Sequence, residues 1–206
     1  MNQDQNSSER YLPVMFVGRK EELKKFHFLL EEPQKTWLIF LCGEGGIGKT
    51  QLLKKMIEET ETYRQAGHVV LSPSVDELID LHWTENRREE TLLKTMAYCL
   101  GPQYFPHFLD LFEQLGHLDF IPEGEKAVHA LEQLRQAFLD DYGNIEADRV
   151  VWVFDTAEQA GKQIQLALAD ILKQMHQRLP ATLVLMAGRP AAMDWIEKYF
   201  PDLLVL

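Results

Sequence analysis

The sequence predicts an α/β fold in which helices cover both faces of a parallel sheet, which is a three-layer arrangement. Unbroken apolar runs, which suit strands buried on both faces, stand at 37–41, 150–154 and 183–187. Stretches with apolar residues three and four positions apart, the period of a helix, lie between these runs. This alternation is typical of parallel sheets, because each connection between parallel strands must cross over the sheet.

The composition narrows the class of protein. With 206 residues, 46% of them apolar, the chain is long enough for one domain with its own core. Its 21 basic and 32 acidic residues give a net charge of −11, which disfavours a surface that binds nucleic acid directly. Cys42 and Cys99 lie outside any C-x-x-C pair, so we expect neither a disulfide framework nor a zinc site. These features indicate a reducing, cytoplasmic compartment.

The N-terminal residues 1–10 are polar, and we expect them to form a disordered tail before a folded domain over 11–206. They lack the apolar segment of a signal peptide, and no stretch approaches the about 18 apolar residues of a membrane span. We therefore expect no contact with a membrane. A predicted helix follows Gly18 and ends before Pro33. Its inward face would consist of Leu23, Phe26, His27 and Leu30.

The most specific motif lies directly after the first apolar run. It matches G-x-x-x-x-G-K-[ST] and consists of Gly43, Glu44, Gly45, Gly46, Ile47, Gly48, Lys49 and Thr50. A helix pattern from Gln51 to Tyr63 completes the strand–loop–helix setting of this motif. In such a loop the backbone N–H groups surround phosphate oxygens, Lys49 reaches the β- and γ-phosphates, and the Thr50 hydroxyl binds Mg²⁺. The alternative is a glycine-rich turn that only caps the helix.

The region after the loop helix is predicted to be mainly helical. A short strand candidate lies at 68–71, and 75–81 suits a second extended or mixed piece. Helical patterns follow over 88–100, 105–115 and 128–138. The inward residues of the last pattern would be Val128, Leu131, Leu134 and Phe138. We expect 102–145 to be a helical insertion whose aromatic side chains pack between helices.

Two acidic residues follow the second apolar run. Asp155 ends this run at the sheet edge where open α/β sheets bind ligands, and it is the predicted Mg²⁺ residue together with Thr50. The alternative role for Asp155 is to cap the next helix. Glu158, three positions on, is the candidate to orient or deprotonate an attacking water. The alternative for Glu158 is a solvated residue in the first turn of that helix.

Arg189 follows the third apolar run, after a helix pattern over 164–179. It would lie on the same sheet edge as Asp155 and the glycine loop, where a guanidinium can sense a γ-phosphate. The alternative is a surface arginine in a turn. A helix over 192–199 and an apolar run at 203–206 finish the chain. Because that run lacks a cap or a polar tail, we expect the chain to be a fragment of a longer protein.

These residues together resemble the STAND ATPases, the signal-transduction ATPases with numerous domains, which are relatives of the AAA+, NB-ARC and NACHT modules. The resemblance is carried by Phe16-Val17-Gly18-Arg19-Lys20-Glu21-Glu22-Leu23, by Gly-Gly-Ile-Gly-Lys-Thr at 45–50, and by the strands that end at Asp155 and Arg189. It implies a P-loop NTPase fold of the ASCE/AAA+-like kind with a central five-stranded parallel sheet. The Arg189 strand would lie between the loop strand and the Asp155 strand. It also implies that Val17, Gly18 and Arg19 border an adenine pocket and that Arg189 occupies the sensor position.

Two features depart from the family pattern. Relatives often have a second acid directly after the Mg²⁺ aspartate or a few positions on, whereas here Thr156 follows Asp155 and only Glu158 fits. In addition, the helical lid and winged helix of the relatives would have to follow Leu206. The group that accepts the proton in hydrolysis is therefore left open.

The resemblance implies a function as a regulatory switch. ATP or ADP would bind with Mg²⁺, and slow ATP hydrolysis by Lys49, Glu158 and Arg189 would control self-association into a homo-oligomer. The expected partners are the nucleotide and the C-terminal lid, winged-helix and sensor domains. One alternative is an AAA+ ATPase that loads onto nucleic acid, similar to replication initiators, although the acidic balance disfavours it. Another is a nucleotide-stabilised scaffold without turnover.

Overall fold

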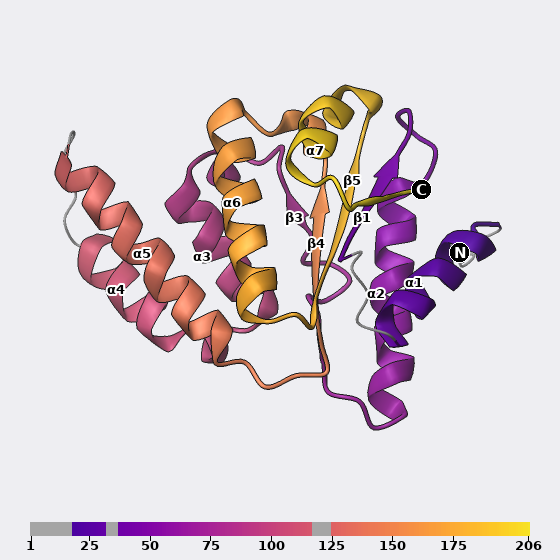
Figure 1. Ribbon diagram of the computed structural model, residues 1–206, viewed down its shortest axis with the longest axis horizontal. Helices are drawn as coiled ribbons and strands as arrows, with labels where there is room; N and C mark the ends of the chain where they lie inside the picture. The colour runs from indigo at the N-terminus through magenta and orange to yellow at the C-terminus, as the bar shows by residue number, and fades with distance from the viewer. Residues whose placement is uncertain (1–17, 32–36, 117–124) are drawn as a thin grey trace, which may run out of the picture.

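The computed structural model describes residues 18–31, 37–116 and 125–206. A parallel sheet forms the centre of the molecule, with helices on both of its faces (Figure 1). The predicted disordered tail, Val17 and the segment between the two helices of the insertion lie outside the described residues. Within the described ranges, no helix is both long and apolar enough to cross a membrane.

The sheet contains the three predicted strands at its centre. Its strands are β1 (Leu38–Cys42), β2 (Val70–Leu71), β3 (Ile79–Asp80), β4 (Arg149–Asp155), β5 (Thr182–Gly188) and β6 (Leu204–Val205). The order is β2-β4-β5-β1-β6, with β3 also paired to β4, and every pairing is parallel. The strand that ends before Arg189 therefore lies between the loop strand and the Asp155 strand, as predicted. The carboxyl ends of β1, β5 and β4 meet at one edge.

The prediction of five strands was wrong, because the described residues form six. The short strands β2 and β3 both pair with β4, at opposite ends of it: Val70 aligns with Arg149, and Asp80 aligns with Asp155. Pro73 lies in the connection between them. Since proline has no N–H to donate, it interrupts a ladder of backbone hydrogen bonds. One edge strand is thereby divided into two.

The helices agree closely with the predicted patterns. They are α1 (Lys20–Glu31), α2 (Lys49–Gln65), α3 (Glu89–Leu100), α4 (Pro106–Gly116), α5 (Glu125–Gly143), α6 (Lys162–Arg178) and α7 (Met193–Tyr199). Short 3-10 turns lie at Thr84–Arg87 (η1), Pro102–Tyr104 (η2), Ala157–Gln159 (η3) and Pro190–Ala192 (η4). Helices α1 and α2 cover one face of the sheet, whereas α3 and α6 cover the other, with α4 and α5 packed outside them (Figure 1).

The two faces of the sheet belong to two separate clusters of buried side chains. Successive side chains of a strand point to opposite faces, and β4 shows this clearly. Val151 and Val153 pack with the residues of α1 and α2. Trp152 and Phe154 pack with those of α3, α5 and α6. A strand covered on both faces needs apolar residues at every position, which explains the unbroken run.

The predicted inward face of α5 was wrong at its N-terminal end, because Val128 is 60% exposed. Leu134 and Phe138 lie in the core, as predicted, together with Leu139 and Tyr142. Only the second half of α5 packs against the body of the domain, so the apolar period continues past the part of the helix that is covered.

Cys42 and Cys99 are both free, and burial raises the pKa of Cys99 to about 11.

Candidate functional site

A cavity of about 300 Å³ lies at the carboxyl edge of the sheet. The segment 45–51 forms one wall of it, the end of β4 and the turn after it form a second, and the end of β5 forms a third. The side chains predicted from the sequence that line it are Lys49, Thr50, Gln51, Asp155, Glu158 and Arg189. Residues from distant parts of the chain therefore meet at one place.

The glycine loop between β1 and α2 takes a conformation that favours glycine. Gly46 and Gly48 have φ angles of 84° and 85°, which residues with a Cβ rarely adopt. The N–H of Gly43 donates to the carbonyl of Gly188 at 3.2 Å, so the loop is attached to the end of β5. The N-terminal N–H groups of α2 follow directly, and such a helix end attracts anions.

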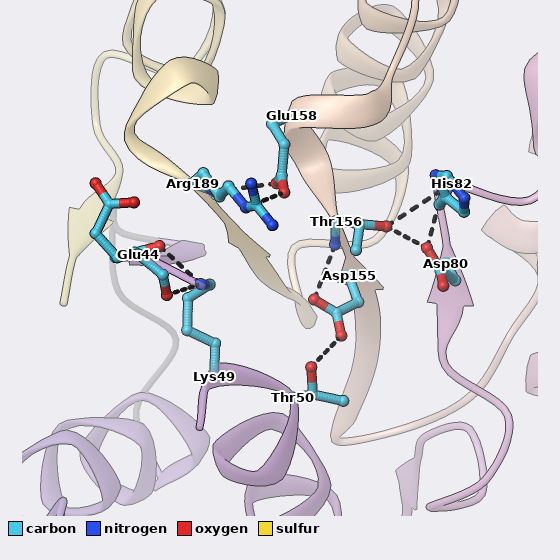
Figure 2. A network of polar contacts seen from close by, with 10 residues as sticks. Glu44, Lys49, Thr50, Asp80, His82, Asp155, Thr156, Glu158 and Arg189 are labelled. Carbon is cyan, nitrogen blue, oxygen red and sulfur yellow. Dashed lines mark hydrogen bonds and ion pairs between the residues drawn. The ribbon is translucent and has the colours of Figure 1, made fainter. Parts of the chain in front are cut away.

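Lys49 lies within the curve of this loop. Its Nζ donates to the carbonyl oxygens of Gly43, at 2.7 Å, and of Glu44, at 2.9 Å (Figure 2). An ammonium group makes up to three such bonds and exchanges partners by rotating its flexible stem. The lysine charge is therefore already at the loop, where a phosphate oxygen would replace one of these carbonyl groups.

Thr50 and Asp155 join the loop to the sheet edge. The Thr50 hydroxyl donates to Asp155 Oδ2 at 2.6 Å, and the other carboxylate oxygen accepts from the Thr156 N–H at 2.8 Å (Figure 2). Because the hydroxyl gives its one proton to Asp155, both lone pairs of its oxygen are left for other partners. One of them can bind a hard cation such as Mg²⁺.

These oxygen donors fit a nucleotide-bound Mg²⁺ better than a metal held by protein alone. Among the residues described, no group of three or more His, Cys, Asp or Glu side chains is arranged to hold a metal ion. Mg²⁺ in nucleotide sites needs only one or two protein ligands, since phosphates and waters supply the others. Thr50 and Asp155 are the residues that would hold it.

Arg189 and Glu158 lie on the opposite side of the cavity and form an ion pair. Arg189 Nε lies 3.3 Å from Glu158 Oε1, and the Arg189 backbone N–H donates to Glu158 Oε2 at 3.0 Å (Figure 2). The Glu158 side chain is only 12% exposed, which does not fit a solvated glutamate, whereas that of Arg189 is 58% exposed. A Cβ added to Gly45 would lie 3.3 Å from Arg189 Nη2, so the guanidinium lies beside the loop.

The segment before α1 also reaches the loop. Arg19 Nη2 donates to the carbonyl of Ile47 at 3.2 Å, and its Nη1 pairs with Glu22 at 2.9 Å. The hydrogen bond from Arg19 holds the pKa of Glu22 below its usual value. Gly18 and Arg19 both have positive φ angles, 98° and 61°, which turn the chain into α1 beside the loop. Of the three residues predicted to border the adenine, these two are described.

The sequence did not indicate a further cluster beside Asp155. Asp80, at the end of β3, is in register with Asp155 and accepts a hydrogen bond from the Thr156 hydroxyl (Figure 2). The His82 N–H donates to Asp80 Oδ1 at 2.9 Å and to Thr156 Oγ1 at 3.2 Å. The available signal was the position of Asp80 at the end of an extended segment. A strand of two residues, however, is too short to show the alternation of side chains that identifies a strand in a sequence.

No protein-family model matches the chain, and no curated protein sequence matches it. What the site binds is therefore inferred from its chemistry. A glycine-rich loop, one lysine, a hydroxyl joined to a carboxylate and an arginine together fit the oxygens, the charge and the metal of a nucleoside triphosphate.

Proposed function

We propose that this domain binds ATP or ADP with Mg²⁺ and hydrolyses ATP slowly, as the switch module of a STAND-type signalling ATPase. The observation that supports this most strongly is the hydrogen bond of 2.6 Å between Thr50 and Asp155, which are 105 positions apart. It brings the hydroxyl of the loop motif onto the acid at the end of β4. A glycine turn that only caps a helix has no need of such a partner.

In this proposal each side chain has a defined task. Lys49 leaves the loop carbonyls for the β- and γ-phosphate oxygens, and the N–H groups of the loop and of α2 surround the phosphates. Thr50 and Asp155 hold the cation. Mg²⁺, when bound, neutralises the charge that develops on the phosphate oxygens.

Arg189 would report which nucleotide is bound. Its guanidinium is exposed and beside the loop, so a γ-phosphate can replace Glu158 as its partner, whereas ADP has no group to do so. A ligand shifts a conformational equilibrium only through contacts that differ between the two states. The exchange of partner at Arg189 is such a contact, and it would couple the nucleotide to self-association.

Isothermal titration of ATP and ADP in the presence of Mg²⁺ tests the binding. Lys49→Ala should abolish measurable affinity for both nucleotides, because it removes the one positive charge inside the loop. Lys54→Ala is the matched control, since this lysine lies on the same helix and pairs with Asp76 instead. Unaltered ATP binding by Lys49→Ala would contradict the proposal. Light scattering with ATP and with ADP then tests self-association.

The nucleic-acid alternative is not supported by the charge of the chain, which is −11. A protein that neutralises phosphates of a duplex needs a basic surface, and its affinity falls steeply as the salt concentration rises. Salt-sensitive binding of duplex DNA by this domain would favour the alternative over the switch.

A further inference from the structure

Hydrolysis of ATP requires a group that takes a proton from the attacking water, and the inference below rests on the proposed function. Glu158 is poorly suited to this task in the structure. One of its oxygens faces Arg189 Nε at 3.3 Å, and the other accepts from the Arg189 N–H at 3.0 Å. Both oxygens are therefore directed at the same arginine, and the Arg189 backbone N–H would still hold one of them when the guanidinium turns to a γ-phosphate.

Asp80 offers a second carboxylate at the same edge of the sheet. It ends β3 and lies directly opposite Asp155, at the spacing of neighbouring strands. Thr156 lies between Asp80 and the cavity: its hydroxyl bonds to Asp80, and the residue itself lines the cavity. Asp80 is only partly buried, so a proton that it takes up can pass to solvent.

The hydrogen bonds of the Thr156 hydroxyl leave room for a water. A hydroxyl has one proton to donate and two lone pairs that accept. The proton goes to Asp80 Oδ1, and one lone pair accepts from the His82 N–H at 3.2 Å. The second lone pair has no partner within the described part of the chain. An attacking water can donate to it.

The backbone conformation of Thr156 indicates that several contacts hold this residue in place. Thr156 has a φ angle of 54°, which is an outlier for a β-branched residue. Such strain persists only where surrounding contacts hold it, and it is concentrated at functional sites. Here the holding contacts come from Asp155, Asp80 and the N–H of Gln159, which donates to the Thr156 carbonyl at 2.9 Å.

We propose that Asp80 accepts the proton in ATP hydrolysis and that the Thr156 hydroxyl carries the proton to it. The water oxygen forms a bond to the γ-phosphorus while its proton passes to Thr156 Oγ1. The proton of Thr156 passes to Asp80 Oδ1 in the same step. The bond from the γ-phosphorus to the bridging oxygen breaks, and that oxygen leaves with the electron pair as part of ADP. The products are ADP, phosphate and a protonated Asp80, which returns its proton to solvent.

Phosphate release in single turnover, measured beside nucleotide binding, tests the proposal. Asp80→Asn keeps an oxygen that accepts from Thr156 and His82 but is a far weaker base, so the rate should fall about 100-fold or more. Thr156→Val should have a similar effect, and Thr156→Ser should restore the rate. In all three variants, the affinity for ATP and the Mg²⁺ concentration that gives a half-maximal rate should stay as in the original domain. Asp76→Asn is the matched control, because the Asp76 side chain is 92% exposed.

The outcomes separate this inference from the proposed function. A domain that does not bind ATP would contradict both. If ATP binds but Asp80→Asn or Thr156→Val hydrolyses it at the original rate, only the proton path is wrong. If the original domain binds ATP and releases no phosphate, both the proton path and the hydrolysis in the proposed function are wrong, and only nucleotide binding stands. If Thr156→Val instead shifts the Mg²⁺ dependence and Thr156→Ser does not restore the rate, Thr156 only orients Asp155, and the path is again wrong.

Discussion

Arg189 and Glu158 form an ion pair beside the glycine loop, with 3.3 Å between Arg189 Nε and Glu158 Oε1. The same carboxylate accepts from the Arg189 backbone N–H, and the guanidinium lies next to Gly45. A γ-phosphate on the loop would therefore compete with Glu158 for one guanidinium. This competition makes the pair a point at which ATP and ADP can be distinguished.

Glu158→Gln should raise the affinity for ATP relative to ADP, because the neutral amide holds Arg189 less strongly. The expected gain is at most about fivefold, since a partly exposed ion pair contributes about 0.2–1 kcal/mol. Competition titrations with both nucleotides measure the ratio. Glu61→Gln is the control, because Glu61 pairs with Arg64 on the exposed face of α2. An equal change in the two affinities would show that Glu158 plays no part in discrimination.

Thr50→Val should remove the part of ATP affinity that depends on Mg²⁺. The hydroxyl is a predicted cation ligand and donates to Asp155, so its loss should cost at least about 10–100-fold, which is the effect of losing even an outer partner of a metal site. ATP titrations with Mg²⁺ and with EDTA measure this difference. Thr95→Val serves as control, since the Thr95 hydroxyl donates to the carbonyl of Thr91 within α3. A Mg²⁺ effect of the original size in Thr50→Val would exclude Thr50 as the ligand.

Tyr142→Phe should destabilise the fold by about 1–3 kcal/mol, the cost of leaving a buried polar group without a partner. The Trp152 Nε1–H donates to the Tyr142 hydroxyl at 3.3 Å, and that hydroxyl bonds to Thr182 Oγ1 at 2.7 Å. Phenylalanine would leave the buried indole N–H unpaired. Chemical denaturation measures the change, and Tyr98→Phe should have little effect because Tyr98 is 52% exposed. A change of the same size in both variants would contradict this reasoning.

His176 should make the domain less stable at acidic pH. Its ring is stacked on Trp37, with 4.6 Å between the ring centroids, and burial lowers its pKa below the ordinary value of 6.5. In the unfolded chain the ring binds a proton as the pH falls through that value, whereas in the folded domain it resists protonation. The unfolding free energy should therefore decrease from about pH 7 towards the lowered pKa.

His176→Gln should flatten this pH dependence, and His129→Gln should not, because His129 is exposed. Denaturation midpoints between neutral and mildly acidic pH provide the comparison. An identical pH dependence in His176→Gln and the original domain would show that other groups cause it.

Much of the fold was predictable because its signals are local. The burial of β4 and β5 on both faces requires apolar residues at every position, and the helices show their period where one side packs on the sheet. Val128 shows the limit of this reasoning, since an apolar residue at the correct period is exposed where α5 extends past the core. The period does not tell which part of a helix will be covered.

The sequence by itself determined which segments carry the site: the glycine loop, Asp155 and Arg189 each follow a strand pattern, and parallel strands bring their carboxyl ends to one edge. Only the tertiary structure decided which side chains become partners there. Glu158 pairs with Arg189, and Thr156 with Asp80, because strand order and register bring them within hydrogen-bonding distance. Those contacts join residues far apart in the chain, and a local pattern contains no information about the distance between them.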